Sequence, residues 1–332
     1  MWPAIGHTGN SSQMDTGWRP TASIELLRIR AAWLTKIRSF FAARDVLEVD
    51  TPVLSNASVT DPNIESLLTT VNGKRYYLQT SPELYMKRLL AAGSGPIFQV
   101  AHVFRDGEQG RLHNPEFTLV EWYRPAFDQF QLMREVSALV SELTGREIPE
   151  EEVRYLTYTE LFEQHTGLDP MHENWSALNE FCASRQLHCP VDDHWEGAMD
   201  WLLAMVIQPV MRGLVFVNDF PAAMASLAKL DDNNPRVARR FELFIDGIEM
   251  ANGFEELTDV DEQQQRFIRE NQQRQAAGKP LIAIDEAFLG ALGAGIPETS
   301  GVALGLDRLL MWSLQLDHVT RAMSFSPFVS ND

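Results

Sequence analysis

The 332-residue sequence predicts an α+β fold, because segments with the two-residue period of strands occur between segments with helical period. Two observations are the most informative. Residues 97–104 and 116–123 are rich in Val, Phe, Trp and Tyr and flank a polar segment with two glycines and a proline, a pattern typical of an antiparallel hairpin. Later in the chain, Asp246 and Gly247 lie between two β-rich segments and indicate a tight hairpin turn.

Composition and charge limit the class of protein. A chain of this length with 45% hydrophobic residues can bury one large core, so a single catalytic domain with an insertion is as plausible as two domains. The net charge of −18 argues against a nucleic-acid-binding surface, which needs Lys and Arg to neutralise phosphates. The longest apolar run, residues 201–207, is far shorter than the ~20 residues of a membrane span, and the N-terminus lacks signal-peptide features. We therefore expect a soluble, cytoplasmic protein.

The first elements follow from composition and period. Residues 1–20 are rich in Gly, Ser, Thr and Asn without periodicity, which predicts a disordered tail. Residues 21–44 carry apolar side chains at helical spacing and predict a long amphipathic helix. The next segment, VLEVDTPVLS at residues 46–55, is predicted to be extended, because a helix cannot continue through Pro52.

A second helix is predicted to begin near Ser81. A short strand over residues 76–79 precedes Ser81, Pro82 and Glu83, which would supply an N-cap, a first-turn proline and a first-turn acid. Capping alone would explain these three residues as well as contact with a ligand would.

The first hairpin gathers polar groups on one face. Because side chains alternate along a strand, Phe117, Leu119, Glu121 and Tyr123 should share a face, and a purely structural strand rarely places a Glu there. Arg105 follows the end of the preceding strand, where its guanidinium could hold a phosphate and a carboxylate together. The alternative is a surface hairpin with an incidental Arg.

Between about residues 130 and 213 the pattern is mainly helical, with candidate helices at residues 132–143, 158–165, 177–185 and 198–211. No catalytic motif occurs there, so we expect an insertion that covers one side of the site. Cys182 and Cys189 have six residues between them, which matches neither a zinc ribbon nor a redox pair, and we expect both to be reduced.

The second hairpin predicts a cation site. Counting outward from the turn, Phe244 faces Glu249, and Glu242 shares the face of Phe244. Glu242 and Glu249 would then be diagonal neighbours about 7–8 Å apart at the backbone, close enough to bind one cation. Like charges so placed repel each other without a counter-ion. Two solvated acids on an exposed sheet are the alternative.

Two further segments complete the chain. Residues 261–277 are rich in Gln and poor in apolar residues, which predicts an exposed helix with a structural role. Residues 301–316, GVALGLDRLLMWSLQL, predict a strand and turn of small residues that lead into a helix with Asp307 and Arg308 in its first turn. The glycines would allow the backbone to approach a ligand closely.

The strings FRDGEQGRLHNPEF and TLVEWY, residues 104–123, resemble motif 2 of the class II aminoacyl-tRNA synthetases, and within them the lysyl branch. The helix, strand and proline of residues 21–55 resemble motif 1, and residues 301–316 resemble motif 3. The resemblance covers about residues 21–328. It implies an antiparallel six-stranded sheet flanked by helices, one catalytic domain over residues 21–332, and a homodimer formed through motif 1.

The resemblance also implies an ATP site and a magnesium site. In this family Arg105 bridges the amino-acid carboxylate and the α-phosphate, and Phe117 and Arg308 lie on opposite faces of adenine. Arg105 and Arg308 are therefore the expected catalytic residues, and Glu242 and Glu249 would hold Mg²⁺. The expected ATP-binding residues are Arg105, Asp106, Gly107, Asn114, Phe117, Glu249, Met250, Gly305 and Arg308. Gly107 departs from the family, which usually has a Glu there in contact with the adenine amino group, whereas Glu108 comes one place late.

The implied amino-acid site consists of Ser81, Pro82, Glu83, Glu121, Tyr123, Asn252, Glu256 and Ala303. Lysyl-tRNA synthetases have Gly-Leu-Gly-Ile-Gly where this chain has GVALG at residues 301–305, so Ala303 adds a methyl group to the pocket wall.

The molecule that accepts the activated amino acid is inferred from the residues that precede the catalytic core. Lysyl-tRNA synthetases carry an N-terminal anticodon-binding OB-fold, for which about 20 residues leave no room. We therefore expect the chain to resemble the lysyl-synthetase paralogues that use ATP to activate (R)-β-lysine, or lysine, and transfer it to a lysine side chain of translation elongation factor P, without tRNA. A truncated synthetase that charges tRNA or another amine is one alternative. A non-catalytic sensor is another, against which the intact Arg105, Glu242, Glu249 and Arg308 argue.

Overall fold

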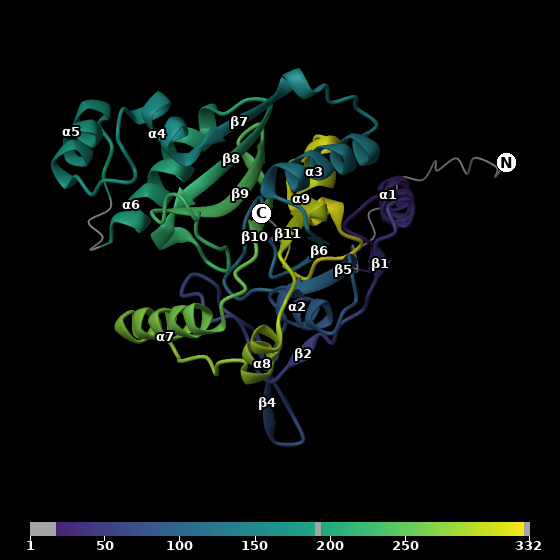
Figure 1. The fold of residues 1–332 in the computed structure, drawn as a ribbon. Coiled ribbons are helices and arrows are strands. Elements are labelled where there is room, and N and C mark those ends of the chain that lie inside the picture. Colours follow the sequence, from purple (N-terminus) through teal and green to yellow (C-terminus); the bar gives the residue numbers. More distant parts are fainter. Residues whose placement is uncertain (1–17, 190–193, 329–332) are drawn as a thin grey trace, which may run out of the picture.

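An eight-stranded mixed sheet forms the centre of the molecule (Figure 1). The structure is a computed structural model that describes residues 18–189 and 194–328, so nearly all of the expected N-terminal tail lies outside the described residues. The strands are, in spatial order, β1 (Leu47–Glu48), β5 (Ile97–Phe104), β6 (Glu116–Pro125), β11 (Thr299–Gly305), β10 (Ile248–Glu255), β9 (Val237–Ile245), β8 (Leu214–Pro221) and β7 (Val153–Thr157).

The prediction of an antiparallel six-stranded sheet is wrong in the number of strands and in the direction of two of them. The six strands from β5 to β8 in the spatial order are antiparallel, but β1 pairs with β5 and β7 pairs with β8 in parallel. Parallel neighbours need a long crossover, usually through a helix. Helix α2 (Glu83–Ala91) lies in the crossover from β1 to β5, and the helices that follow β7 provide the other.

Three helices cover the face of the sheet that points away from the candidate site. They are α1 (Ile24–Ala42), α3 (Gln129–Thr144) and α9 (Leu306–Ser313), and their apolar sides share one core with strand residues such as Trp122. Helix α1 begins at Ile24, three residues after the predicted start, because the Ser23 side chain caps it and accepts a hydrogen bond of 3.2 Å from the Leu26 backbone N–H. The opposite face of the sheet is left for the site.

Three other helices pack together beneath the sheet in the view of Figure 1. Helices α2, α7 (Val260–Ala276) and α8 (Glu286–Ala294) share a core that includes Met86, Tyr123, Phe267 and Phe288. The prediction of a simply exposed helix over residues 261–277 is wrong for one side of α7, because Phe267 and even Arg274 are buried. The sparse apolar pattern concealed this buried face.

A small sheet precedes these helices in the chain. It consists of β2 (Leu54–Ser55), β4 (Lys74–Leu78) and β3 (Leu68–Val71), in that order, and its hairpin projects at the bottom of Figure 1. Strand β4 contains most of the predicted strand over residues 76–79. The segment over residues 46–55 is extended, as its proline predicted, and contributes β1 and β2.

The region from about residue 130 to 213 is mainly helical, as predicted, but it also contains strand β7. Its helices α4 (Tyr158–Thr166), α5 (Trp175–Arg185) and α6 (Trp195–Leu202) form a separate core against β8, at the upper left of Figure 1. Helix α6 continues as a π-helix, Leu203–Ile207, and a 3₁₀ turn, Gln208–Val210. Further 3₁₀ turns are Glu150–Glu152, Ala222–Met224 and Val319–Ala322.

Cys182 and Cys189 form a disulfide, so the expectation of two reduced cysteines is wrong. Gln186 ends α5 in the left-handed conformation, and the Leu187 N–H donates to the Cys182 carbonyl. This reversal brings the two Cα atoms to 6.0 Å, a normal separation for a disulfide.

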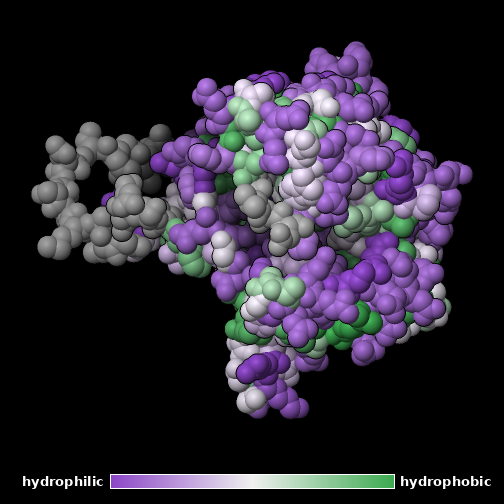
Figure 2. Space-filling model, turned by 90° about the vertical axis from the view of Figure 1, so that its left-hand side faces the viewer, coloured by the Kyte–Doolittle hydropathy of each residue, from purple (hydrophilic) through white to green (hydrophobic). Residues whose placement is uncertain are grey.

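The face shown in Figure 2 is mainly hydrophilic, with hydrophobic side chains in small groups. Among the helices that the structure describes, none has the length and apolar character needed to cross a membrane.

Candidate active site

Two rows of directly opposed residues cross the open face of the sheet from β6 to β9. The first row is Glu121, Ala303, Asn252 and Glu242. The second, two residues away along each strand, is Tyr123, Gly301, Phe254 and Arg240. Because residues two apart on a strand share a face, both rows point the same way. Residues far apart in the sequence thus form one polar surface.

The second hairpin forms as predicted, with Phe244 opposite Glu249 and Ile245 opposite Ile248. Asp246 and Gly247 have φ angles of 49° and 78°, as a tight turn of this type requires. A β-bulge between Glu249 and Ala251 then shifts the register, so that Asn252 lies opposite Glu242. No pattern in the sequence indicated this bulge.

A buried lysine that the sequence analysis missed lies behind the amino-acid residues. The Lys87 Nζ atom is 2.7 Å from the Glu83 carboxylate and 2.5 Å from that of Glu256, and the Lys87 side chain is 1% exposed. Burial alone would lower the pKa of Lys87, but the charges of Glu256 and Glu83 raise it well above its usual value. The spacing of Glu83 and Lys87, four residues apart on a predicted helix, was the available signal.

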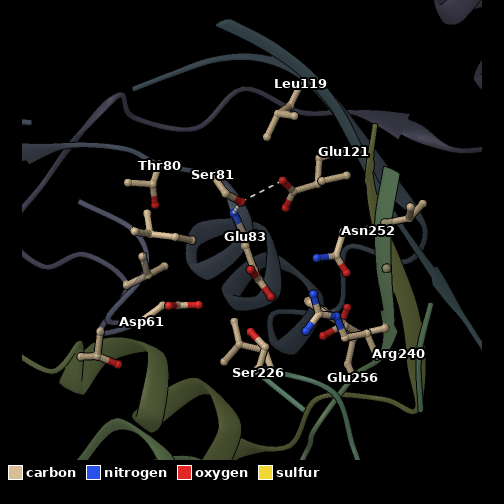
Figure 3. Close-up of a pocket in the computed structure, with 18 of the residues that line it drawn as sticks. Asp61, Thr80, Ser81, Glu83, Leu119, Glu121, Ser226, Arg240, Asn252 and Glu256 are labelled. Carbon is tan, nitrogen blue, oxygen red and sulfur yellow. Dashed lines mark hydrogen bonds between the residues drawn. The ribbon is translucent and has the colours of Figure 1, made fainter. Parts of the chain in front are cut away.

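Glu121 is, like Glu256, a buried acid of the amino-acid site. The Tyr123 hydroxyl donates to its carboxylate at 2.7 Å and the Ser81 hydroxyl donates at 2.8 Å, as the dashed line in Figure 3 shows. Ser81 Oγ also accepts from the Glu83 backbone N–H at 3.0 Å. The prediction of Ser81 as the N-cap and Pro82 as a first-turn residue is wrong by one position, because α2 begins at Glu83 and Pro82 is its N-cap. Burial raises the pKa of Glu121 to about 7, and the charge of Glu83 adds to this effect.

Gly301 provides space for the side chains of Tyr123 and Glu256. A Cβ atom at this position would lie 2.3 Å from the Tyr123 ring and 2.4 Å from Glu256 Oε1. Only glycine allows the two side chains to approach the strand so closely, which is the role predicted for the glycines of this segment.

Arg105 lies at the end of β5, between the amino-acid residues and the motif 2 loop. Its Nε atom donates to the Thr80 carbonyl at 3.4 Å, and its guanidinium carbon is 5.1 Å from the centre of the Phe117 ring. Glu108 contacts the same guanidinium at 3.4 Å. Gly107 has a φ of +77°, a conformation that disfavours the Glu usual in the family.

Arg308 begins the motif 3 helix and contacts the start of β10. It donates to the Glu249 carbonyl at 3.1 Å and to the Glu249 carboxylate at 3.4 Å. Its neighbour Asp307 is buried and accepts from the Thr118 N–H at 2.7 Å and from Arg30 of α1 at 2.5 Å. Asp307 therefore ties together three elements behind the site.

The remaining ATP candidates make local contacts. The Asp106 carboxylate accepts from the Gly107 N–H at 2.9 Å. The buried Asn114 side chain donates to the Glu116 carbonyl at 2.6 Å and accepts from Ser326 at 2.9 Å. Met250 is buried at the bulge, and Gly305 lies opposite Leu119. In this structure these residues shape the loop and the strand ends around Arg105 and Arg308.

Glu242 and Glu249 have the chemistry of a magnesium site shared with phosphate. No group of three or more His, Cys, Asp or Glu that could hold a metal occurs in residues 18–189 and 194–328. Mg²⁺ commonly uses only one or two carboxylates, together with phosphates and water, so a pair fits. Burial raises the pKa of Glu242 to about 7. The Arg240 guanidinium, 2.5 Å away, lowers this pKa, whereas the negative charge of Glu249 raises it. A bound cation would stabilise both ionised carboxylates.

The two rows form one wall of a pocket (Figure 3). Helix α7 and the segment that follows β2 form the facing wall. Pocket residues that the sequence analysis did not single out include Thr60, Asp61, Arg240 and Glu270. Their segments carry no motif, so only the folded chain reveals them.

Comparison with known proteins adds a family and relatives. The model of the family "tRNA synthetases class II (D, K and N)" matches residues 12–328. Elongation factor P–(R)-β-lysine ligase of Pasteurella multocida is 44% identical over 316 residues, which cover 93% of this chain and 97% of the relative. The proteins of the same name from Edwardsiella ictaluri and Proteus mirabilis are 44% identical over 319 residues, with the same coverage.

Proposed function

Since the chain belongs to the class II tRNA synthetase family for D, K and N, we propose that it activates (R)-β-lysine with ATP and transfers it to translation elongation factor P. The acceptor group is a lysine side chain of that factor. The observation that carries the proposal is the acidic pocket on the sheet, which suits a diamine and lies beside Arg105. Near-full coverage of relatives with this activity supports the choice of acceptor.

The pocket carries the charge that a diamine requires. Glu83 and Glu256 share the single ammonium of Lys87, which leaves one net negative charge buried beside Glu121. Buried carboxylates are stable only when they are paired or protonated, and burial raises the pKa of both Glu121 and Glu256. A substrate ammonium would supply the missing positive charge.

In the first step a carboxylate oxygen of the amino acid attacks the α-phosphorus of ATP, and the bond to pyrophosphate breaks. Arg105 contacts both groups and neutralises charge, while Phe117 stacks on adenine and Arg308 faces the phosphates. Glu242 and Glu249 would hold Mg²⁺, which supplies further charge neutralisation on the phosphates when bound. This step depends on positioning and electrostatic stabilisation more than on proton transfer.

In the second step the amine of the acceptor lysine attacks the carbonyl carbon of the aminoacyl-adenylate. The bond to AMP breaks, an amide bond forms and one proton leaves the amine. No tRNA takes part in this reaction.

We also propose a homodimer formed through the motif 1 segment. Leu47, Val53 and Leu54 are 55%, 40% and 40% exposed along this segment, and apolar side chains grouped in this way are typical of contact surfaces. Sedimentation velocity of the wild type and of a Leu54→Lys variant tests the proposal. Dissociation of a wild-type dimer by the substitution is expected, and a monomeric wild type would contradict it.

Intact-mass spectrometry of elongation factor P incubated with the enzyme, ATP and each lysine isomer tests the function. The expected result is one added lysyl group, faster with (R)-β-lysine than with α-lysine. An acceptor variant with Arg in place of the modified lysine is the control and should stay unmodified. Efficient charging of lysine tRNA, without modification of the factor, would overturn the proposal in favour of a tRNA-charging enzyme.

A further inference from the structure

Asp61 and Glu270 form a second acidic group in the same pocket, facing the sheet. Asp61 lies between β2 and β3, and Glu270 lies on α7. Both line the pocket, and Figure 3 shows the Asp61 carboxylate directed into it from the side opposite Asn252. The reaction described above uses neither residue.

The segment that carries Asp61 is fixed to α7. The Arg274 side chain, 1% exposed, donates to the carbonyls of Asp61 and Ile64 at 3.0 and 3.2 Å and to the Glu65 carboxylate at 2.8 Å. The Thr60 hydroxyl donates to Glu270. A buried guanidinium with this many partners holds them in one arrangement, because losing any partner would leave a buried donor unsatisfied. The Asp61 carboxylate is therefore presented on a rigid support.

The same segment lies beside Arg105. The Asp106 N–H donates to the Glu65 carbonyl at 2.8 Å, which joins residue 65 to the residue directly after Arg105. Asp61 thus belongs to the end of the pocket where the substrate carboxyl group is held. Glu256, which pairs with the buried Lys87, lies next to Gly301 on the other side of the pocket from Asp61 (Figure 3).

Charge distinguishes the two acidic groups. Glu83 and Glu256 already pair with the ammonium of Lys87. Among the described residues, neither Asp61 nor Glu270 has a salt-bridge partner within 4 Å. Asp61 accepts a hydrogen bond from the Asn63 N–H at 2.7 Å. Burial raises the pKa of Glu270 to about 7, and the charge of Asp61 adds to this. Across the pocket, the buried carboxamide oxygen of Asn252 has no hydrogen-bond donor in the part of the chain that the structure describes. A ligand with N–H groups would satisfy this oxygen and the two acids.

We propose that Asp61, supported by Glu270, binds the ammonium nearest to the substrate's carboxyl group, while Glu121 and Glu256 bind the terminal ammonium. This inference rests on the proposed function and adds a specificity-determining residue to it. A diamine then spans two acidic groups, and the distance between them selects the position of the amine that lies closer to the carboxyl group.

Pyrophosphate exchange by the wild type and by Asp61→Asn, with two substrates, tests the proposal. The first substrate is (R)-β-lysine, and the second is 6-aminohexanoic acid, which lacks the amine near the carboxyl group. We expect Asp61→Asn to lower kcat/KM for (R)-β-lysine by about 10- to 100-fold, because a charge-assisted contact is lost, and to leave the value for 6-aminohexanoic acid unchanged. Asp232→Asn, an exposed change of the same kind, is the control and should alter neither.

A second variant and the wild type distinguish failure of the Asp61 proposal from failure of the proposed function. Glu270→Gln should produce the same substrate-dependent pattern with a smaller factor, which keeps the test valid if Asp61→Asn folds poorly. An equal loss with both substrates, or no loss with either, would overturn the role of Asp61. Unchanged exchange with slower transfer to the protein acceptor would assign Asp61 to the acceptor amine and also overturn it. Absence of wild-type exchange with (R)-β-lysine would instead refute the proposed function.

Discussion

Arg308 donates to both the backbone carbonyl and the carboxylate of Glu249, at 3.1 and 3.4 Å. This contact joins the first turn of α9 to the start of β10, directly before the bulge. A guanidinium proposed to contact the ATP phosphates is thus positioned by a carboxylate proposed to hold the metal. Glu249 therefore combines two roles that a substitution would remove together.

Changing Glu249 to Gln should abolish Mg²⁺-dependent pyrophosphate exchange, with a loss of about 100-fold or more, because the metal carboxylate is lost and the Arg308 contact weakened. The protein should remain folded, since the Glu249 side chain is 38% exposed. Exchange rates across a magnesium titration, with circular dichroism as a check on folding, provide the measurement. Glu180→Gln on the exposed side of α5 is the control. Unchanged exchange at limiting Mg²⁺ would rule out the metal assignment.

Changing Ala303 to Gly should relax the preference for (R)-β-lysine over α-lysine. Ala303 lies directly between Glu121 and Asn252 in the first row, so its methyl group projects from the sheet among residues proposed to bind the substrate. One carbon in a close-packed pocket changes discrimination by about 1–3 kcal/mol, or about 10- to 200-fold. The ratio of kcat/KM for the two isomers, from pyrophosphate exchange, measures it. An unchanged ratio would place isomer choice elsewhere, for example in the Asp61 group.

The KM for the amino acid should fall as pH rises from 6 to 8. Burial raises the pKa of Glu121 to about 7, so the carboxyl group is largely neutral at pH 6 and attracts an ammonium only after it ionises. Titration of one such group changes affinity by about tenfold over this range. KM measured against pH for the wild type and for Glu121→Gln tests this. The variant should have a higher and flatter KM, and an equally steep profile would assign the titration to another group.

Changing Lys87 to Met should destabilise the protein, because Glu83 and Glu256 would lose the ammonium that they share. Removing one partner of a buried ion pair costs about 3–5 kcal/mol. The thermal midpoint should therefore fall by several degrees, and Lys87→Met combined with Glu256→Gln should recover part of the loss. Calorimetry of the wild type, both single variants and the double variant measures the coupling. Additive effects of the two substitutions would show that the pair does not interact.

The sequence predicted the two hairpins because their signals are local. Asp246 and Gly247 determine a turn, and alternation along each strand then determines which side chains share a face, so the pairing of Phe244 with Glu249 followed directly. The parallel pairing of the two edge strands was missed for the opposite reason. Strand β1 has two residues, too few for a period, and β7 lies within a helical region, so their parallel pairing depends on crossovers that no local pattern describes.

The sequence by itself determined the motifs, the faces of the strands and the family to which the chain belongs. The tertiary structure alone decided which distant side chains meet. Lys87 reaches Glu256 across 169 positions of sequence, and Arg274 of α7 holds the segment that contains Asp61. Local periodicity depends on neighbours within a few residues, whereas these contacts arise when separate elements pack against one core. For that reason Glu83, Glu121 and Glu256 could be predicted as site residues, whereas Lys87, Asp61 and Glu270 were recognised as their neighbours only in the folded chain.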